Sequence, residues 1–378
     1  MSMLTRFRFF LAVSILLGTS IGLSHAQNVA STATTEGYYP PRKGTWQRVT
    51  VTDAGADPEL LSQAMNLAGK KNSKGVVILH KGKILAEQYW GGWTKDSVGP
   101  LNSATKSIAS ALVGMAIESG HIEGVEQSCS DFLSEWKRRP RYRRIQIQHL
   151  LSMTSGLKNS KGIMVAGFIV KDERAFATKL PIEYRPGTHW DYHNSAYHLL
   201  FPILEEATGI PLGRYTNEKL AQPLGMEHAR WRRRITNKKQ FNLMEMSTRD
   251  AARFGLLISR DGNWNGDQLV NSQWIANSTE PWDAAVNPAY GNLWWLNGGA
   301  HYFLPLSDEP QGGPLFDGVP DDAFAALGKD DQKIYVVPSL DLVVTRLGDA
   351  ASETSYALSR FDSEFLGLIC ESLNSDSK

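Results

Sequence analysis

Apolar runs of strand length occur near both ends of the chain, and patterns of helical spacing dominate its middle. Residues 75–79 and 83–89 are short apolar runs that flank His80-Lys81-Gly82, which is typical of a β-hairpin. Three more runs rich in β-branched residues come late in the sequence, at residues 323–327, 333–337 and 342–346. Because turn residues separate these runs, we expect strands from both ends to pair in one antiparallel sheet.

Helical spacing begins at Asp57-Pro58-Glu59, where an acidic N-cap and a proline precede an apolar stripe. From about residue 103 to residue 274 most strong patterns are helical, and residues 351–372 have the spacing of a closing helix. The pattern predicts an α/β (α+β) fold, in which helices flank an antiparallel sheet. A mostly helical subdomain, at about residues 103–290, is expected to be inserted into the sheet domain.

The first 26 residues have the pattern of a signal peptide. Arg6 and Arg8 precede an apolar stretch, and small residues around Ala26 indicate cleavage before Gln27. We therefore expect a periplasmic or secreted protein with no stable membrane span after cleavage, and an uncleaved membrane anchor is the alternative. The remaining segments are a leader or linker, a folded domain and a polar tail, at residues 27–55, 56–372 and 373–378.

The chain of 378 residues carries a formal net charge of +1, which gives no indication of nucleic-acid binding. Two local basic runs, residues 137–144 and 230–234, are predicted to be solvated faces, with contact to an anionic polymer or substrate as the alternative. The two cysteines, Cys129 and Cys370, are far apart in sequence. An exported protein permits a disulfide between them, and two buried free thiols are equally compatible with the sequence.

Candidate chemistry lies at Ser103-Ala104-Thr105-Lys106-Ser107, directly before the apolar helical residues 108–117. A serine and a lysine three positions apart share a helix face, and a neutral, desolvated lysine can take the serine hydroxyl proton. The N-terminus of the following helix supplies backbone donors for an oxyanion. The alternative is an N-capping serine followed by a surface lysine. Three further pairs have the same spacing, but in turns or polar segments: Ser134/Lys137, Ser155/Lys158 and Ser375/Lys378.

A nucleophile of this kind needs a second proton-handling group near the leaving group, and Tyr192-His193-Asn194 is the candidate. The Tyr192 phenol can shuttle a proton between the serine and the leaving group, and the Asn194 amide can orient the lysine and the substrate carbonyl. Tyr215-Thr216-Asn217 and Tyr290-Gly291-Asn292 also match this pattern. Context selects the first of the three, because it lies in a loop that leads into a helix.

With both motifs in place, the chain resembles the serine β-lactamase-related family, which comprises class C β-lactamases, D-Ala-D-Ala carboxypeptidases and esterases and amidases on the same scaffold. The resemblance covers about residues 55–370 and rests on seven stretches: residues 103–107, 149–157, 186–194, 223–226, 249–255, 290–295 and 338–344. It implies that Ser103 is the acylated nucleophile and Lys106 its base. It also implies that Tyr192 is the proton shuttle and Asn194 the orienting amide.

The third motif of that family, Lys- or His-x-Gly on the edge strand, differs in this chain. The aligned residues are Ala326, Leu327 and Gly328, so the cation is missing while the glycine is kept. The resemblance implies an oxyanion hole formed by the Ser103 N–H and a second N–H on this strand, at Gly328 or Lys329. A missing cation weakens recognition of the carboxylate that β-lactams and D-Ala peptides carry. The surrounding sequence is acidic instead, with Asp317, Asp321, Asp322, Asp330 and Asp331.

The sequence therefore predicts an exported serine hydrolase that cleaves an ester or amide through a Ser103 acyl-enzyme, with no metal or organic cofactor. The expected substrate is a neutral or cationic small molecule or peptide rather than a β-lactam. Two alternatives stay open. One is a β-lactamase or D-Ala-D-Ala carboxypeptidase, and the other is a catalytically silent binding or regulatory homologue.

Three groups of residues near these motifs have structural interpretations beside functional ones. His189, His193 and His198 suggest a metal site, but no carboxylate completes a familiar ligand set, and the serine apparatus accounts for the region better. Arg249 and Asp250 are expected to form an ion pair at a helix start. Three tryptophans either form an acyl pocket or belong to the core: Trp190, Trp294 and Trp295.

Overall fold

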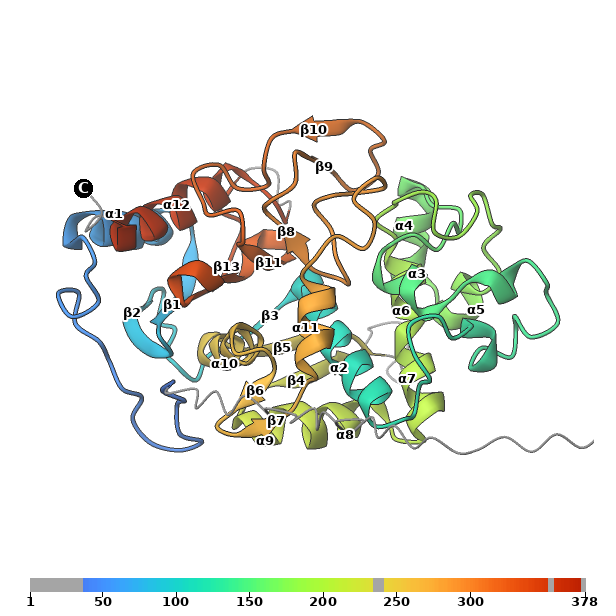
Figure 1. Cartoon of the computed structure of the whole chain (residues 1–378), viewed down its shortest axis with the longest axis horizontal. Helices are drawn as coiled ribbons and strands as arrows, with labels where there is room; N and C mark the ends of the chain where they lie inside the picture. The colour runs from blue at the N-terminus through green and yellow to red at the C-terminus, as the bar shows by residue number, and fades with distance from the viewer. Residues whose placement is uncertain (1–36, 234–240, 353–356, 375–378) are drawn as a thin grey trace, which may run out of the picture. The chain divides into compact units, whose positions relative to one another are not determined.

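A computed structural model of the chain describes residues 37–233, 241–352 and 357–374. Within these residues the largest sheet has six antiparallel strands in the order β2-β1-β13-β12-β11-β8 (Figure 1). Its strands are β1 Ser73–His80, β2 Lys83–Tyr89, β8 Trp295–Leu296, β11 Phe324–Gly328, β12 Gln332–Val337 and β13 Leu342–Gly348. The first strand of the chain thus pairs with the last, which confirms the prediction that strands from both ends share one antiparallel sheet.

The described residues also contain three smaller sheets and twelve α-helices. The remaining strands are β3 Val98–Pro100, β4 Arg230–Arg233, β5 Phe241–Ser247, β6 Asn263–Trp264, β7 Asp267–Gln268, β9 His301–Phe303 and β10 Pro310–Gly312. The helices are α1 Pro58–Lys70, α2 Thr105–Glu118, α3 Ile147–Leu151, α4 Lys161–Ile169, α5 Glu173–Ala177, α6 Asn194–His198, α7 Leu200–Thr208, α8 Leu212–Thr216, α9 Gln222–Leu224, α10 Thr248–Ser259, α11 Ser272–Ser278 and α12 Arg360–Asn374. None of the helices in the described residues has the length and apolar character needed to span a bilayer.

Helices cover both faces of the six-stranded sheet. On one face, Gly255 of α10 approaches β12 and β13 so closely that an added Cβ would lie 3.0 Å from the side chain of Ile334. On the other face, Tyr335 donates a hydrogen bond of 2.6 Å to Asp362 of α12, which packs against α1. Because neighbouring residues of a strand point to opposite faces, α10 and α12 lie on opposite sides of the sheet (Figure 1).

The helix that follows Ser103 is buried in the interior of the protein. A short 3-10 turn, η1 Asn102–Ala104, leads directly into α2, and every residue from Thr105 to Ala116 is buried. α2 packs against α7 on one side and contacts β11 on the other. A helix surrounded by protein is expected to be mostly apolar, and apart from Ser110 the residues of α2 from Ile108 to Ala116 are apolar. α2 therefore connects the helical region to the sheet edge.

The three-stranded sheet β3-β5-β4 is not indicated by the sequence patterns, which are mostly helical between residues 103 and 274. Its edge strand β4 is the second basic run, and Arg230 and Arg232 both lie within ion-pair distance of Glu245 on β5. Charged side chains are a common means of protecting an edge strand from further pairing. Strand β4 therefore carries exposed arginines, which agrees with the prediction that this basic run faces the solvent.

The two ends of the described chain differ from the sequence expectations in detail. The closing helix begins at Arg360 rather than at residue 351, because the Ser359 backbone N–H donates to Asp362 Oδ2 at 2.8 Å and ends the preceding loop. Residues 37–55 of the predicted leader pack on the domain, since Trp46 is buried and Arg253 donates to the carbonyls of Pro40 and Pro41. The predicted signal peptide and residues 375–378 of the tail lie outside the described residues.

Both cysteines are free and buried in this structure. Cys129 lies in a 3-10 turn that precedes α3, and Cys370 lies in α12. Of the two possibilities that the sequence leaves open, the structure therefore has the two buried thiols.

Candidate active site

The Ser103 side chain lies at the start of the buried helix α2. Ser103 is the middle residue of the turn η1 and is partly exposed, whereas Lys106, one turn later, is only 4% exposed. Backbone N–H groups in the first turn of helical structure have no partner within the helix, so the Ser103 N–H is placed where an oxyanion could be bound. Ser103 is not the N-cap of either helix, and Lys106 is not a surface lysine. The alternative interpretation of the motif, an N-capping serine followed by a surface lysine, is therefore wrong.

The Lys106 amine lies among polar and aromatic groups. Its Nζ atom is 3.3 Å from Ser103 Oγ and donates a hydrogen bond of 2.8 Å to Asn194 Oδ1. The rings of Tyr192 and Tyr197 each lie with their centroids 4.6 Å from the same nitrogen. The structure thus brings together the four residues that the two sequence motifs single out.

Burial changes the acidity of this amine. Desolvation lowers the pKa of Lys106 to about 7, and the negative charge of Glu173 opposes this shift. At neutral pH a large share of the Lys106 side chains is therefore uncharged. An uncharged amine next to a serine hydroxyl can accept its proton, which a surface lysine of ordinary pKa cannot do.

Tyr192 is held at the N-terminal end of the short helix α6. The backbone carbonyl of Tyr192 accepts a hydrogen bond of 3.2 Å from Asn159 Nδ2, and the His193 side chain caps α6 by accepting from the Ala196 N–H. Burial raises the pKa of the Tyr192 phenol, and its hydrogen bond with Ser103 lowers that pKa in part. Tyr192 is therefore a neutral phenol that contacts the serine hydroxyl.

Strand β11 lies against the turn that carries Ser103. The short strand β8 pairs with Phe324 and Ala325, so among the described residues the last three positions of β11 have no strand partner on that side and form the edge of the sheet there. A Cβ on Gly328 would collide with the carbonyl oxygen of Leu101 and lie 3.1 Å from the Ala104 nitrogen. Glycine at position 328 is thus required by the close approach of two backbones.

The turn after β11 is joined to the same segment. The Asn102 side chain donates a hydrogen bond of 2.8 Å to the carbonyl oxygen of Lys329. Asn102, Asp330 and Asp331 all have left-handed backbone conformations, with φ of 47°, 61° and 57°. Non-glycine residues adopt this conformation uncommonly, and asparagine and aspartate tolerate it best. The Lys329 side chain is exposed and lies past the end of the strand.

The acidic residues around the third motif have separate environments. Asp331 is fully buried and pairs with Lys333, and Asp322 accepts hydrogen bonds from Ser339 on a distant turn. Asp317 lies beside Ser363 of α12, where its backbone N–H donates to the serine. The Asp330 carboxylate is the acidic group that reaches the turn carrying Ser103, with Oδ2 3.5 Å from Asn102 Nδ2. Of the acidic residues in this stretch, Asp330 therefore contributes most of the negative charge close to Ser103.

The structure adds residues that the sequence motifs did not single out. Tyr197, three positions after Asn194 on α6, contacts the Lys106 amine with its ring, and its i, i+3 spacing was the available signal. Glu173 of α5 and His198 of α6 form a buried pair with Oε1 and Nδ1 2.7 Å apart. No local pattern indicates this pair, because its members lie on different helices.

Aromatic rings enclose Tyr192. Trp295 stacks on its ring with centroids 5.9 Å apart, and Tyr290 makes an edge contact at 6.5 Å. Trp190 lies at 6.3 Å from the Tyr192 ring. Trp294 instead stacks on Phe254 in the core. Trp190 and Trp295 are thus part of the site surroundings, and Trp294 is a core residue.

Several motif alternatives have structural roles. Ser155 accepts a hydrogen bond from the Leu157 N–H, and Lys158 is exposed and pairs with Glu183. Arg249 pairs with Glu87 at 2.6 Å rather than with Asp250, so the ion pair expected from the sequence is wrong. Adjacent residues of a helix point away from each other, which leaves Arg249 free to reach a distant strand.

The three histidines do not converge on one point. His189 stacks on Tyr184, the His193 ring contacts the carbonyl of Lys158, and His198 pairs with Glu173. Within the described part of the chain, no group of three or more His, Cys, Asp or Glu side chains is placed to hold a metal ion.

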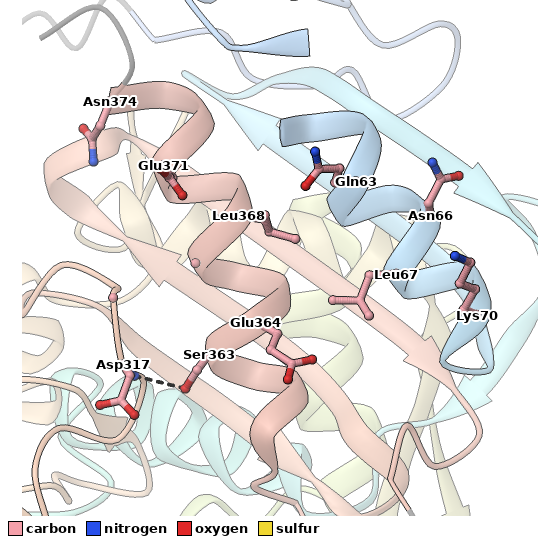
Figure 2. Close-up of a pocket in the computed structure, with 12 residues that line it drawn as sticks. Gln63, Asn66, Leu67, Lys70, Asp317, Ser363, Glu364, Leu368, Glu371 and Asn374 are labelled. Carbon is pink, nitrogen blue, oxygen red and sulfur yellow. Dashed lines mark hydrogen bonds between the residues drawn. The ribbon is translucent and has the colours of Figure 1, made fainter. Parts of the chain in front are cut away.

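A separate hollow lies between α1 and α12 (Figure 2), two helices that lie on the face of the sheet away from α10 (Figure 1). It has a volume of about 950 Å³ and is lined mainly by polar side chains, including Gln63, Lys70 and Glu371. None of the residues of the serine–lysine–tyrosine cluster lines it. The hollow is therefore distinct from the candidate active site.

An antiparallel sheet whose edge strand lies against a buried Ser-x-x-Lys helix defines the class of β-lactamase and penicillin-binding-protein folds. The family model for beta-lactamase matches residues 61–365, and the chain belongs to this family.

Solved structures of similar fold have low sequence identity. The protein of Bacillus anthracis named "Putative 6-aminohexanoate-dimer hydrolase" superposes with a TM-score of 0.68 at 18% identity, over 90% of each chain. The octameric penicillin-binding protein homologue of Pyrococcus abyssi gives a TM-score of 0.62 at 16% identity, over 82% of this chain and 76% of that one. At these identities the likeness establishes the fold.

Curated relatives include hydrolases. An uncharacterised protein of Alkalihalophilus pseudofirmus is 26% identical over 304 residues, 72% of this chain and 82% of that protein. Esterase EstB of Burkholderia gladioli is 28% identical over 173 residues, which are 40% of this chain and 43% of the esterase. The D-aminopeptidase of Brucella anthropi is 23% identical over 41% of this chain and 32% of its own length. The alignments to the two named enzymes thus span less than half of each.

Proposed function

We propose that the protein is a serine hydrolase that cleaves an ester or amide through an acyl-enzyme on Ser103. The observation that carries this proposal is the buried Lys106 amine, whose pKa of about 7 makes it a competent base 3.3 Å from Ser103 Oγ. A silent homologue would have no need for this arrangement, because a buried lysine lowers the stability of the fold.

In the acylation step, Ser103 Oγ bonds to the substrate carbonyl carbon as its proton passes to Lys106 Nζ. The Ser103 N–H and an N–H of the Gly328–Lys329 segment stabilise the negative oxygen. The bond to the leaving group then breaks, and the leaving group takes the proton of the Tyr192 phenol. The Lys106 ammonium returns a proton to Tyr192, so that both residues regain their starting protonation states.

In the deacylation step, water attacks the acyl carbon while its proton passes to the uncharged Lys106 amine, either directly or through Tyr192, whose phenol gives its own proton to Lys106 as it accepts the one from water. The bond between the acyl group and Ser103 Oγ breaks, and that oxygen takes the proton back. Asn194 acts as a positioning residue, because its Oδ1 atom binds the Lys106 amine at 2.8 Å. No step needs a metal or an organic cofactor.

The substrate that we propose is neutral or cationic. Ala326 stands where the related enzymes carry a lysine or histidine, so a substrate carboxylate has no cationic partner there. Asp330, next to the nucleophile turn, would repel such a carboxylate and attract an amine. An esterase and an aminopeptidase among the relatives agree with an ester or amide substrate. Export to the periplasm or the medium, with removal of residues 1–26, belongs to the same proposal.

Intact-mass labelling with a fluorophosphonate tests the activated serine. The mature protein is expected to gain one adduct at pH 8, and the Ser103→Ala variant none. A Ser155→Ala variant is the matched control, because Ser155 has the same spacing to a lysine but an exposed partner; it should label like the wild type. A folded wild-type protein without an adduct between pH 6 and pH 9 would support the silent homologue instead.

A substrate comparison separates the two enzymatic possibilities. The kcat/KM for neutral and amine-bearing p-nitrophenyl esters should exceed that for nitrocefin by at least about tenfold, the cost of one mismatched charge. Fast nitrocefin hydrolysis with slow ester hydrolysis would instead establish a β-lactamase.

A further inference from the structure

The exposed large apolar side chains of the described residues gather in one region. There are six of them: Val165, Phe168, Ile169, Tyr184, Leu304 and Leu306. Scattered single apolar residues are normal on protein surfaces, whereas a contiguous group marks an interaction site. Three of the six lie on the helix α4 and the other three on two loops.

Each of these segments contacts residues 189–195, which carry Tyr192 and Asn194. Tyr184 stacks on His189 with ring centroids 3.9 Å apart, and Asp308, close to Leu306, lies 3.3 Å from the same His189. Phe303, next to Leu304, contacts the ring of Trp190. The apolar residues therefore border the segment that carries the proton shuttle.

α4 is tied to this segment at both ends. Before the helix, Asn159 Nδ2 donates to Asp191 Oδ1 at 2.8 Å. Within the helix, Gly167 is buried, and a Cβ there would collide with Ser195 Oγ of α6. Phe168 and Ile169 follow at once and are 51% and 66% exposed. Packing of α4 through Gly167 thus leaves three of its large apolar side chains exposed.

The charged residues of α4 and its two flanking turns are mainly lysines. Residues 158–171 contain three lysines and no acidic residue, although Lys158 pairs with Glu183 and Asp172 follows Lys171. Lys161 begins the helix and Lys171 lies two residues beyond its end, so that cations bracket the apolar side chains; both lysines are exposed. This is the arrangement of a helix that lies in a membrane interface, with apolar side chains in the acyl region and lysines at anionic headgroups. A helix of nine residues is far too short to span a bilayer.

We propose that α4, together with the loops at Tyr184 and at Leu304 to Leu306, docks the protein on an anionic lipid surface. The docking brings the segment of Tyr192 and Asn194 next to the lipid. As a consequence that rests on the proposed function, the substrate is an apolar acyl ester presented at that surface rather than a freely diffusing one.

Vesicle sedimentation tests the docking without any need for catalysis. The full mature protein is mixed with vesicles of phosphatidylglycerol and phosphatidylcholine, or of phosphatidylcholine alone. We expect binding to the anionic vesicles that weakens as salt is raised. The double variant F168S/I169N should bind at least about tenfold more weakly, because two large apolar side chains no longer leave water. S103A should bind like the wild type, which separates docking from acyl transfer.

Charge variants provide the matched control. K161E/K171E should weaken binding to anionic vesicles by at least about tenfold, since each lysine contributes roughly fivefold near such a surface. K70E/K71E changes the same charge at the end of α1 and should bind like the wild type. F168S/I169N should keep the wild-type kcat/KM on a short, water-soluble ester.

Three results would overturn the proposal. The first is the absence of wild-type binding to anionic vesicles at low salt. The second is an equal loss of binding in K161E/K171E and K70E/K71E. The third is a dimer in light scattering that F168S/I169N converts to a monomer, because α4 would then be covered by a second copy of the chain.

Discussion

The chemical role that we propose for Lys106 has a cost for the stability of the fold. The same burial that lowers its pKa to about 7 also makes its charged form costly in the folded protein. Functional residues are often placed where the fold would be more stable with an apolar side chain. Two measurable consequences follow for this residue, one for activity and one for stability.

The pH profile of kcat/KM should have an acidic limb near pH 7, because only the uncharged Lys106 accepts the serine proton. The Glu173→Gln variant removes a charge that raises the pKa of Lys106, so this limb should move to lower pH. The variant should therefore keep a severalfold larger fraction of its maximal kcat/KM at pH 6. Glu135→Gln, which removes an exposed carboxylate paired with Arg174, is the control and should leave the limb in place. A limb that does not move in E173Q would contradict the proton transfer to Lys106.

The stability of the wild type relative to Lys106→Met should depend on pH. The folded-state pKa of Lys106 is depressed to about 7, so the unfolded state binds more protons between pH 7 and the ordinary lysine pKa. The cost of burying the Lys106 amine to the free energy of folding is therefore largest below pH 7 and becomes smaller as the pH rises. The free energy of unfolding of the wild type, relative to K106M, should therefore increase by about 2 kcal/mol from pH 7 to pH 9. Urea unfolding of both proteins at the two pH values measures this change, and a constant difference would show an ordinary pKa.

Local spacing together with context singled out Ser103 and Lys106, whose side chains lie 3.3 Å apart in the structure. Ser103 and Lys106 are one helical turn apart, and Tyr192 directly precedes the helix that begins at Asn194, so each pair can be seen in the sequence. The Arg249–Glu87 and Glu173–His198 pairs join residues from different elements, and no periodicity indicates them. Long-range partners of this kind become visible only when the elements are packed.

At the scale of elements, the site depends on the contact between β11 and the turn η1. Gly328 permits this contact, and the Asn102 side chain fastens the turn by its hydrogen bond to the Lys329 carbonyl. The proposed oxyanion hole needs one N–H from each of these two segments. In the mechanism that we propose, the separation of these two segments therefore affects the rate of acylation.

Gly328→Ala should lower kcat/KM by at least about 100-fold, because the added methyl group collides with the Leu101 carbonyl and separates the two segments. Its free energy of unfolding should fall by about 1–3 kcal/mol. Gly312→Ala on β10 is the matched control, since no atom lies within 4 Å of the added Cβ. Ester hydrolysis and thermal unfolding of the two variants check this prediction. Equal activity in both would contradict the role of the contact.

The pairing of strands from both ends of the chain in one antiparallel sheet could be predicted from the sequence, because five of the strands are short apolar runs with clear turns; the order of the strands and the two-residue strand β8 could not. The sheet β3-β5-β4 could not, since β4 is a run of arginines around one tryptophan and β3 has three residues. Such strands are specified by their partners and not by their own periodicity. The start of the closing helix was also missed, because the Asp362 carboxylate that binds the Ser359 N–H lies inside the helix.

At the scale of the whole molecule, a buried cluster of charged side chains connects the turn after β11 to the closing helix. Lys333 lies 3.1 Å from Asp331 and 2.6 Å from Asp362, and all three side chains are fully buried. The nearby Arg346 donates to the carbonyls of Asp330 and Asp331 and so fixes the left-handed turn after β11. This cluster joins the site turn to the closing helix α12.

Lys333→Met should lower the free energy of unfolding by about 3–5 kcal/mol, because two buried carboxylates lose their shared cation. Lys74→Met removes an exposed ion pair with Asp349 and should change the free energy of unfolding by less than about 1 kcal/mol. Chemical denaturation of both variants gives the comparison. The triple variant K333M/D331N/D362N should recover part of the loss, and a failure of K333M to destabilise would show that the cluster contributes little.

The two thiols provide independent reporters of how the protein opens. Cys129 belongs to the helical region and Cys370 to α12, and burial raises the pKa of Cys370 to about 12 and that of Cys129 well above its ordinary value. A thiol reagent reacts with the thiolate, so each cysteine is modified only when its surroundings unfold transiently. Equal modification rates at the two positions would mean that the chain opens as one cooperative unit. A faster rate at Cys129 would mean that the helical region, with Tyr192 and Asn194, unfolds while the sheet stays intact.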